Sequence, residues 1–255
     1  MISARAFRGA VSFLTRIPTG TGASTPESMA TWVPYFPVVG ALVGLAGALA
    51  YAAATVVWVP IVAASVAVAV EVGITGGFHE DGLGDWADAL GASDPSHARA
   101  IMKDPRLGSF GVLAIVLSVI LRIGTLASLQ TWSAVAVLPA AHALARAAAT
   151  SMLGSARVAG DGLGAGYARA VSRRTLVTGA AAALLIGVVA IGLWAPVAAA
   201  ACAVIALWLR RAATLRLDGV TGDVLGAIQQ CALVAVLLVA SAVETQGWTP
   251  LAWWR

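Results

Sequence analysis

Residues 75–91 read Thr-Gly-Gly-Phe-His-Glu-Asp-Gly-Leu-Gly-Asp-Trp-Ala-Asp-Ala-Leu-Gly and hold four of the 12 acidic residues of a strongly apolar chain. Asp81, Asp85 and Asp88 stand at positions i, i+4 and i+7, so their carboxylates share one face if the segment is helical. Three like charges on one face repel one another, and residues 75–98 contain no Lys or Arg to offset them. The pattern favours a cation between the carboxylates. A solvated helix face at a membrane surface is the alternative.

The candidate ligands all carry oxygen, which favours a hard metal and above all Mg²⁺. Mg²⁺ is commonly held by one or two carboxylates together with substrate phosphates. The sequence therefore predicts a magnesium site on Asp81, Asp85 and Asp88. Asp223, in the segment 219–226 (Gly-Val-Thr-Gly-Asp-Val-Leu-Gly), is either a further ligand from a distant part of the chain or a helix N-cap.

The composition is that of a membrane protein. Of the 255 residues, 60% are hydrophobic and 11% are charged, whereas about 25% of a soluble domain is charged. Several apolar runs approach or exceed the roughly 20 residues that a helix needs to cross a bilayer. We therefore expect an all-α, polytopic integral membrane helix bundle of about seven transmembrane helices. Residues 1–255 would form a single domain in contact with membrane lipid.

The charge of the chain argues against a nucleic-acid partner. The net charge is only +4, and the basic residues are scattered between the apolar runs instead of forming a patch.

Cys202 and Cys231 lie within apolar runs, where a free thiol packs as a small hydrophobe. The sequence leaves a homo-oligomer open.

Seven apolar spans are predicted, at about 35–58, 60–78, 110–129, 134–153, 175–194, 196–209 and 224–243. The sixth is short, so a re-entrant segment is an alternative there. Residues 1–17 form a basic amphipathic segment of the kind that lies at a headgroup surface. Residues 18–31 are rich in Pro, Gly, Ser and Thr and are expected to form a loop.

The distribution of Lys and Arg predicts which way the bundle faces. With a cytoplasmic N-terminus, the segments 1–34, 79–109, 154–174 and 210–223 all face the cytoplasm. These segments hold 13 of the 16 basic residues, namely Arg5, Arg8, Arg16, Arg99, Lys103, Arg106, Arg157, Arg169, Arg173, Arg174, Arg210, Arg211 and Arg216. Such an asymmetry follows the positive-inside rule. It places the acidic stretch and Asp223 on the cytoplasmic side.

Residues 101–111, Ile-Met-Lys-Asp-Pro-Arg-Leu-Gly-Ser-Phe-Gly, supply groups that could hold a phosphate. Lys103 and Arg106 are cationic, and Gly108 lets a backbone N–H approach a phosphate closely. Asp104 is counted with them as a substrate-binding candidate. The alternative is a basic anchor at the start of the third span.

Ionisable residues inside predicted spans mark functional sites or buried pairs. This chain has four of them: Glu71, Arg122, His142 and Arg146. Glu71 is expected either to pair with an arginine or to act in catalysis. Arg146, and Arg157 in the loop after the fourth span, are further substrate-binding candidates. His79, beside the acidic stripe, is a candidate metal ligand, general base or loop-capping residue.

Three motifs together resemble the cobalamin synthase family, whose members are adenosylcobinamide-GDP ribazoletransferases. They are residues 77–88 (Gly-Phe-His-Glu-Asp-Gly-Leu-Gly-Asp-Trp-Ala-Asp), 102–111 (Met-Lys-Asp-Pro-Arg-Leu-Gly-Ser-Phe-Gly) and 221–226 (Thr-Gly-Asp-Val-Leu-Gly). Segments 13–18 (Phe-Leu-Thr-Arg-Ile-Pro) and 35–40 (Tyr-Phe-Pro-Val-Val-Gly) are similar to the opening of that family. Gly84, Trp86 and Ala89 depart from the family pattern, but no carboxylate is lost.

The resemblance implies a late step of vitamin B12 (cobalamin) biosynthesis at the bacterial inner membrane. The ribose hydroxyl of α-ribazole, or of its 5′-phosphate, would attack the phosphate on the cobinamide side of adenosylcobinamide-GDP. GMP would leave, and adenosylcobalamin or its phosphate would form. Phosphoryl transfer of this kind needs a metal, cations on the phosphate oxygens and a positioned nucleophile. The catalytic set would be His79, Asp81, Asp85 and Asp88, with Mg²⁺ on the three aspartates and Asp223.

Two other classes of protein match parts of the sequence. A CDP-alcohol phosphotransferase also has an acidic motif that begins with Asp-Gly, but that motif continues with Ala-Arg, whereas Asp85 follows directly here. A cation-coupled transporter would place acidic residues near the bilayer midplane on broken helices, where only Glu71 is expected. Release of GMP from adenosylcobinamide-GDP would separate these classes from the cobalamin synthase family.

Overall fold

The computed structural model describes residues 3–21, 24–153, 170–248 and 251–254. The helices in these ranges are α1 (Ala4–Leu14), α2 (Pro26–Trp32), the 3₁₀ turn η1 (Val33–Tyr35), α3 (Phe36–Ala54), α4 (Pro60–Thr75), α5 (Phe78–Ala89), α6 (Pro95–Ile101), α7 (Ser109–Ala127), α8 (Thr131–Thr150), α10 (Arg173–Ile191), α11 (Trp194–Leu217) and α12 (Gly222–Thr245). The predicted all-α fold is confirmed.

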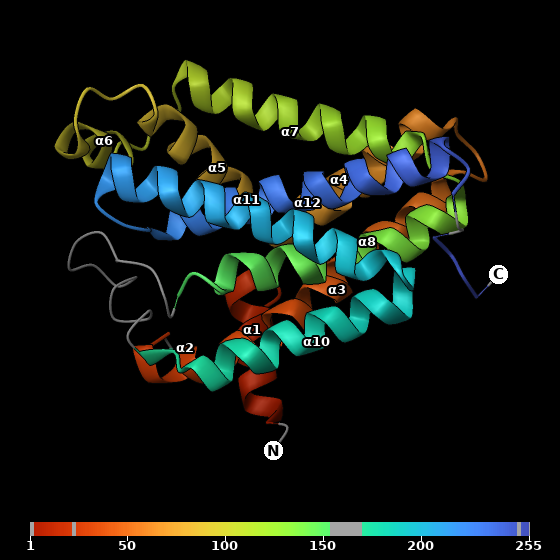
Figure 1. The fold of residues 1–255 in the computed structure, drawn as a ribbon, viewed down its shortest axis with the longest axis horizontal. Helices are drawn as coiled ribbons and strands as arrows, with labels where there is room; N and C mark the ends of the chain where they lie inside the picture. The colour runs from red at the N-terminus through yellow and green to blue at the C-terminus, as the bar shows by residue number, and fades with distance from the viewer. Residues whose placement is uncertain (1–2, 22–23, 154–169, 249–250, 255) are drawn as a thin grey trace.

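Seven long helices form the body of the part of the chain that the structure describes: α3, α4, α7, α8, α10, α11 and α12. They run roughly parallel to the long axis of the view in Figure 1, and successive helices alternate in direction. Each agrees with one of the seven predicted spans to within a few residues, except at the end of the sixth. Among the described residues, five helical segments are long and apolar enough to cross a membrane, or six if α4 and α5 count as one broken span.

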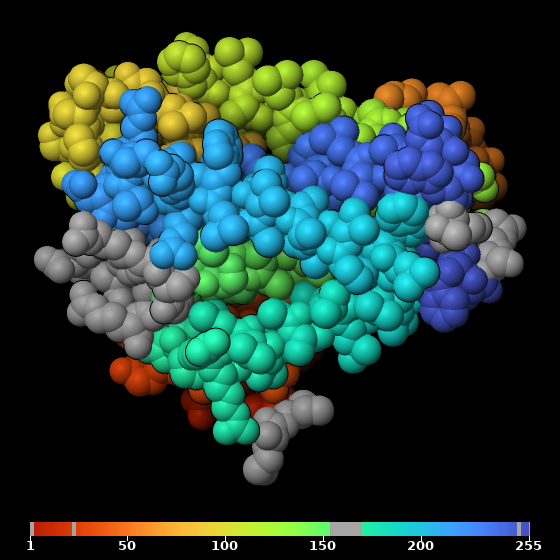
Figure 2. All heavy atoms as spheres, viewed as in Figure 1, coloured from red at the N-terminus to blue at the C-terminus, as the bar shows by residue number. Residues whose placement is uncertain are grey.

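Helix α8 is not among those five, and its position explains why. It lies at the centre of the bundle, packed against α3, α10, α11 and α12. Fourteen of its 20 residues are buried, including His142 and Arg146. Its surface faces protein instead of lipid, so its sequence need not be uniformly apolar. Helices α7, α10 and α11, which lie at the surface of the molecule in Figure 2, carry large exposed apolar side chains such as Leu117 on α7 and Leu185 on α10.

Glycines bring α3 and α8 into close contact. A Cβ added at Gly40 would lie 2.6 Å from the carbonyl oxygen of His142, and one at Gly44 would meet the carbonyl oxygen of Leu138. Any larger residue would push the two backbones apart, as expected where small residues set the packing of membrane helices.

Three short helices lie at one end of the bundle. In Figure 1, α2, α5 and α6 lie at the left end, beside the N-terminal ends of α7 and α12. Residues 79–109 and 210–223, two of the segments that the sequence assigns to the basic side, are at this end. The turns 55–59, 128–130 and 192–193 are at the opposite end, close to the end of the chain.

A sharp bend separates α4 from α5. Gly76 and Gly77 both adopt left-handed conformations, with φ of 70° and 72°, which glycine reaches without the steric cost of a Cβ. The axes of α4 and α5 differ by 90° as a result. The bend is also held from outside, because the Arg16 N–H donates to the Ile74 carbonyl at 2.8 Å.

Two boundaries differ from the prediction. Helix α11 has 24 residues, so the short sixth span ending near Leu209 is wrong, and so is its re-entrant alternative. Arginine is a strong helix former, and polar sequence alone does not end a helix. The helix ends instead where Asp218 turns left-handed at φ 60°. Part of the predicted loop 18–31 is also helical, because Thr25 and Ser28 form a capping box at the start of α2.

Candidate active site

The acidic stripe lies on a single helix, as predicted. Asp81, Asp85 and Asp88 are all in α5, the helix that follows the double-glycine bend. Asp81 is exposed, whereas Asp85 and Asp88 are half-buried. The bend turns this helix across the end of the bundle, where it packs against α12 (Figure 1).

Gly82 is the point at which α5 meets α12. A Cβ at Gly82 would lie 2.9 Å from the carbonyl oxygen of Asp223 and 3.0 Å from its Cα. The first turn of α12 is therefore within backbone contact of α5, and Asp223 joins Asp81 and Asp88 as a charge that acts on Asp85. Residues more than 130 positions apart in the sequence thus form one acidic group.

Asp88 has a second partner besides the acidic group. Its Oδ2 accepts from the Gly108 N–H at 2.7 Å, and its Oδ1 accepts from the Gly111 N–H at 2.9 Å. These N–H groups belong to the open N-terminal turn of α7, so Asp88 caps that helix from a distance. The sequence made the Gly108 N–H a candidate for binding phosphate, but in the structure it donates to Asp88.

The acidic group is compatible with a magnesium ion but is not a preformed cage. Among the described residues, no three His, Cys, Asp or Glu side chains are arranged to hold a metal ion. None of the ion pairs found there involves Asp81, Asp85 or Asp223. Mg²⁺ keeps several waters and uses one or two carboxylates plus substrate phosphates. Neighbouring carboxylates without counter-charge therefore fit this metal better than a cation that needs a full protein cage.

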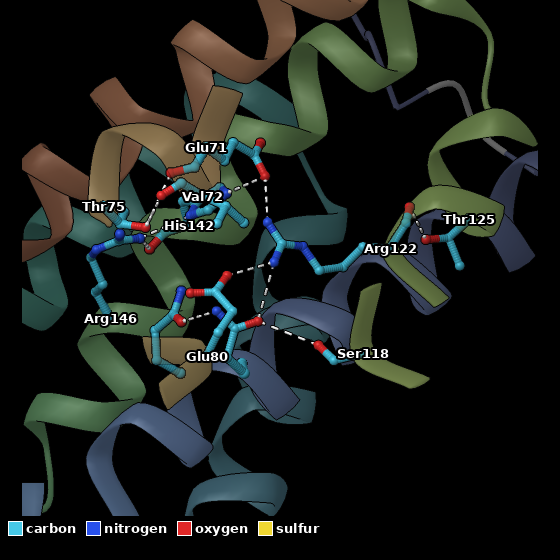
Figure 3. Close-up of polar contacts among 11 residues, drawn as sticks. Glu71, Val72, Thr75, Glu80, Ser118, Arg122, Thr125, His142 and Arg146 are labelled. Carbon is cyan, nitrogen blue, oxygen red and sulfur yellow. Dashed lines mark hydrogen bonds and ion pairs between the residues drawn. The ribbon is translucent and has the colours of Figure 1, made fainter. Parts of the chain in front are cut away.

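A buried ion-pair network anchors α5 to the bundle (Figure 3). The Arg122 guanidinium lies between two glutamates, with Nη2 2.8 Å from Glu71 Oε2 and Nη1 2.8 Å from Glu80 Oε1. Nη1 also lies 3.3 Å from Gln230 Oε1, which in turn accepts from Ser118 at 3.4 Å. The network joins α4, α5, α7 and α12, and Glu80 immediately precedes Asp81. The expected ion pair of Glu71 with an arginine is confirmed.

His142 and Arg146 extend the network into α8. Arg146 Nη1 lies 2.9 Å from His142 Nδ1 and must donate, so Nδ1 is the acceptor and the ring proton is on Nε2. Nε2 lies 3.2 Å from Glu71 Oε2 but makes no hydrogen bond within the described residues. Arg146 is only 2% exposed, and its Nε and Nη2 have no hydrogen-bond partner within the described residues.

A cavity of about 230 Å³ opens beside α5 and the start of α12. Its walls come from α1, α2, α3, α5, α8 and α12 and from the residues that flank α8 and α12: Phe13, Leu14, Met29, Phe36, Phe78, His79, Arg146, Ala149, Thr150, Met152, Leu153, Val220, Thr221, Gly222, Leu225, Gly226 and Gln229. His79 is 6% exposed and contributes to this wall. The cavity adjoins the acidic group through Thr221, which lines the wall and whose hydroxyl lies 3.3 Å from Asp223 Oδ2.

The substrate-binding candidates Lys103, Asp104 and Arg106 do not line the cavity. Arg106 is exposed and makes a forked contact with Asp104, with Nε 2.9 Å from Oδ1 and Nη2 2.7 Å from Oδ2. The Arg106 guanidinium lowers the pKa of the Asp104 carboxyl to about 2 through these hydrogen bonds. Lys103 is exposed in the same loop. Arg157 lies outside the described residues.

Sequence reasoning missed three features of the site. Glu80 is named in the acidic stretch without a role, yet it is the second partner of Arg122. Gln230 joins the network although polar uncharged residues drew no attention in the seventh span. The cavity was not predicted, because its walls come from six helices that are separated along the chain. A charge such as Arg122 inside a span does indicate partners, but it does not say which.

Comparison with known proteins gives a consistent result. The family model described as Cobalamin-5-phosphate synthase matches residues 6–241. Relatives named adenosylcobinamide-GDP ribazoletransferase include one from Bradyrhizobium diazoefficiens, 39% identical over 247 residues and covering 93% of each chain. One from Leptothrix cholodnii is 40% identical over 255 residues, covering 92% of this chain and 94% of the relative. One from Brevibacillus brevis is 32% identical over 237 residues, covering 92% and 96%. No solved structure matches the chain.

Proposed function

Because this chain belongs to the Cobalamin-5-phosphate synthase family, we propose that it is an adenosylcobinamide-GDP ribazoletransferase. It joins adenosylcobinamide-GDP to α-ribazole or α-ribazole 5′-phosphate, releasing GMP and forming adenosylcobalamin or its 5′-phosphate. The observation that carries this proposal is the contact of the acidic helix α5 with the first turn of α12 beside a cavity. That arrangement gathers anionic oxygen ligands next to a pocket large enough for part of a substrate.

In this proposal Asp81, Asp85 and Asp223 would hold Mg²⁺. When bound, the ion would offset the charge that develops on the transferred phosphate. Asp88 contributes charge to the same group and fixes α5 against α7 through its hydrogen bonds to the α7 backbone. The carboxylates would also orient the ion's water ligands, because each oxygen accepts hydrogen bonds in a fixed direction.

His79 is the proposed general base. It lies in the cavity wall, buried from bulk water, two residues before Asp81 in α5. A nucleoside hydroxyl in that part of the cavity would pass its proton to the imidazole as it attacks the phosphorus atom. Lys103 and Arg106, in the exposed loop that follows α6, would contact the phosphates of the nucleotide. For Arg106 this requires that its contact with Asp104 be exchanged for one with phosphate.

The large apolar side chains on the outer faces of α7, α10 and α11 would contact the acyl chains of a bacterial inner membrane. The acidic helix would then lie at the cytoplasmic surface, where both water-soluble substrates are accessible. This orientation follows from the positive-inside rule.

The proposal is tested by following GMP release from adenosylcobinamide-GDP with the chain purified in detergent. We expect GMP and the corrinoid product to form in equal amounts, only when α-ribazole or its 5′-phosphate is present and only with a divalent metal. Product formation with α-ribazole but no GMP release would contradict the proposed bond cleavage. Absence of both products would refute the function.

A further inference from the structure

The cavity has an aromatic and aliphatic wall. Phe13 stacks on Phe36, with ring centroids 5.5 Å apart and planes 8° apart, and it meets the edge of Phe78 at 5.7 Å and 77°. Met29, Met152 and Leu153 complete much of the remaining surface. An apolar, flat group would be well accommodated here, because aromatic rings favour stacked and edge-on neighbours.

Most of the polar atoms at the wall already have partners. The Thr150 hydroxyl donates to the carbonyl oxygen of Arg146 at 2.9 Å, and the Thr221 hydroxyl caps α12 at 3.3 Å from the Val224 N–H. Arg146 and His79 are the exceptions. The buried Nε and Nη2 groups of Arg146 have no acceptor within the described residues, and the His79 ring faces the cavity as the proposed base. A buried donor without an acceptor is costly, so the ligand of this cavity should offer an acceptor to Arg146 and be mostly apolar where it meets the aromatic and aliphatic wall.

Comparing the cavity with the parts of the proposed substrates leaves one candidate. The corrin ring is far too large for about 230 Å³, a volume below the roughly 300–1,000 Å³ typical of pockets for drug-sized ligands. Guanine and adenine carry several donors and acceptors that an apolar wall would leave unpaired. Ribose and phosphate are polar throughout. The base of α-ribazole, a dimethylated benzimidazole, is flat, largely apolar and has one free acceptor nitrogen.

Resting on the proposed function, we infer that this cavity is the binding site for the base of the nucleoside acceptor, an apolar bicyclic aromatic ring. Arg146 donates a hydrogen bond to the ring nitrogen that carries no sugar. The base then lies between α1, α3, α5 and α8, and the ribose extends toward Thr221 and Gly222, where the acidic group begins. In this placement the cavity, and not the acidic helix, selects which base enters the product.

The test uses the full chain in detergent and two free bases, 5,6-dimethylbenzimidazole and adenine, with binding measured by calorimetry. Ala149→Leu fills the cavity from a wall position that is 6% exposed. Ala180→Leu, on the exposed surface of α10, is the matched control. Arg146→Met removes the donor while keeping much of the side-chain volume. Thermal unfolding of each variant checks that it is folded.

We expect the wild type and Ala180→Leu to bind dimethylbenzimidazole equally and adenine at least tenfold more weakly. Ala149→Leu should weaken binding of dimethylbenzimidazole at least tenfold. It should raise the KM for α-ribazole by a similar factor and change the KM for adenosylcobinamide-GDP less than twofold. Arg146→Met should weaken binding of dimethylbenzimidazole severalfold. It should also reduce the preference for dimethylbenzimidazole over 5,6-dimethylindole, which lacks the acceptor nitrogen.

Unchanged base binding in a folded Ala149→Leu protein would overturn the inference, as would an effect confined to the KM of the corrinoid. Failure of the inference and failure of the proposed function can be told apart. If the wild type releases GMP but Ala149→Leu binds the base normally, the function stands and the cavity assignment fails. If Ala149→Leu abolishes base binding but the wild type releases no GMP, the cavity assignment stands and the function fails.

Discussion

The carboxylate of Asp88 accepts a hydrogen bond of 2.7 Å from the backbone N–H of Gly108, the residue that caps the N-terminus of α7. A second bond, from Gly111, makes the contact bidentate. A Cβ at Gly108 would lie 2.5 Å from Asp88 Oδ1, so the glycine is required by the carboxylate. Asp88 is therefore the member of the acidic stripe for which a structural role is visible.

Asp88→Asn should destabilise the protein. Asn offers one acceptor oxygen instead of two and no charge for the helix N-terminus, so we expect a loss of roughly 1–2 kcal/mol. For a chain of this size that corresponds to a fall in Tm of about 2–8 °C. Thermal unfolding in detergent measures it. Gly108→Ala should give a similar loss through its clash with Asp88, and equal Tm values for wild type and both variants would contradict the capping role.

Asp85→Asn should act on activity and not on stability. Within the described residues Asp85 makes no ion pair, and its like-charged neighbours include Asp81 and Asp223. Removing its charge relieves repulsion, so the Tm of the metal-free variant should equal or exceed that of the wild type. GMP release should fall by orders of magnitude and recover in part at raised Mg²⁺ or with Mn²⁺.

The control for this experiment is Asp218→Asn, an exposed aspartate whose left-handed conformation Asn also tolerates. It should keep wild-type turnover. EDTA should abolish turnover of the wild type, and addition of Mg²⁺ should restore it. Full activity in EDTA, or in Asp85→Asn, would mean that the acidic stripe is a solvated helix face without a metal.

Arg122→Met should be among the most destabilising single substitutions in the chain. It leaves Glu71 and Glu80 buried without their shared partner, and breaking a buried ion pair costs about 3–5 kcal/mol. Arg99→Met breaks an exposed pair with Asp218 and should cost less than about 1 kcal/mol. Thermal unfolding of both variants gives the comparison. Similar losses would show that the buried network does not hold the bundle together.

Arg106→Lys should mainly impair use of the nucleotide-activated corrinoid. Lysine keeps the charge but loses the planar fork that arginine offers to a phosphate. We expect a higher KM for adenosylcobinamide-GDP with little change in the KM for α-ribazole. Arg99→Lys, in α6, is the matched control. Unchanged kinetics in a folded Arg106→Ala protein would reduce Arg106 to a basic anchor at the membrane surface.

Reporter fusions test the orientation of the bundle. A reporter placed after Arg255 should map outside the cytoplasm, and one inserted in 154–174 should map inside, because the basic residues gather at one end of the helices. Two reporters on the same side would exclude the arrangement of alternating helices.

The sequence predicts which segments are helical, but it does not predict which residues of different helices contact one another. The spacing of Asp81, Asp85 and Asp88 placed all three on one helix, because helical periodicity is a local property. The cap that Asp88 provides depends on where α7 begins in space, and no local pattern encodes that approach. The pairing of Arg122 with Glu80 crosses 42 positions for the same reason.

The predicted end of α11 is wrong for a local reason. Hydropathy falls at Arg210, so a span was expected to stop there, but a helix needs a conformational signal to end and not a change in polarity. Asp218 in a left-handed conformation supplies that signal. In α2 the signal was legible, since Thr25-Pro26-Glu27-Ser28 is a typical helix start, although the richness in Pro, Gly, Ser and Thr favoured a loop.

The enclosed position of α8 has a consequence for the order in which the bundle is assembled. This helix carries His142, Arg146 and an internal Pro139, and it is not among the described helices that are apolar enough to cross a membrane. It follows α7 after a connection of three residues, 128–130, and α7 is strongly apolar. We therefore expect the two helices to enter the membrane as a hairpin. Helix α8 is enclosed only when α10, α11 and α12, made later, pack against it together with α3, made earlier.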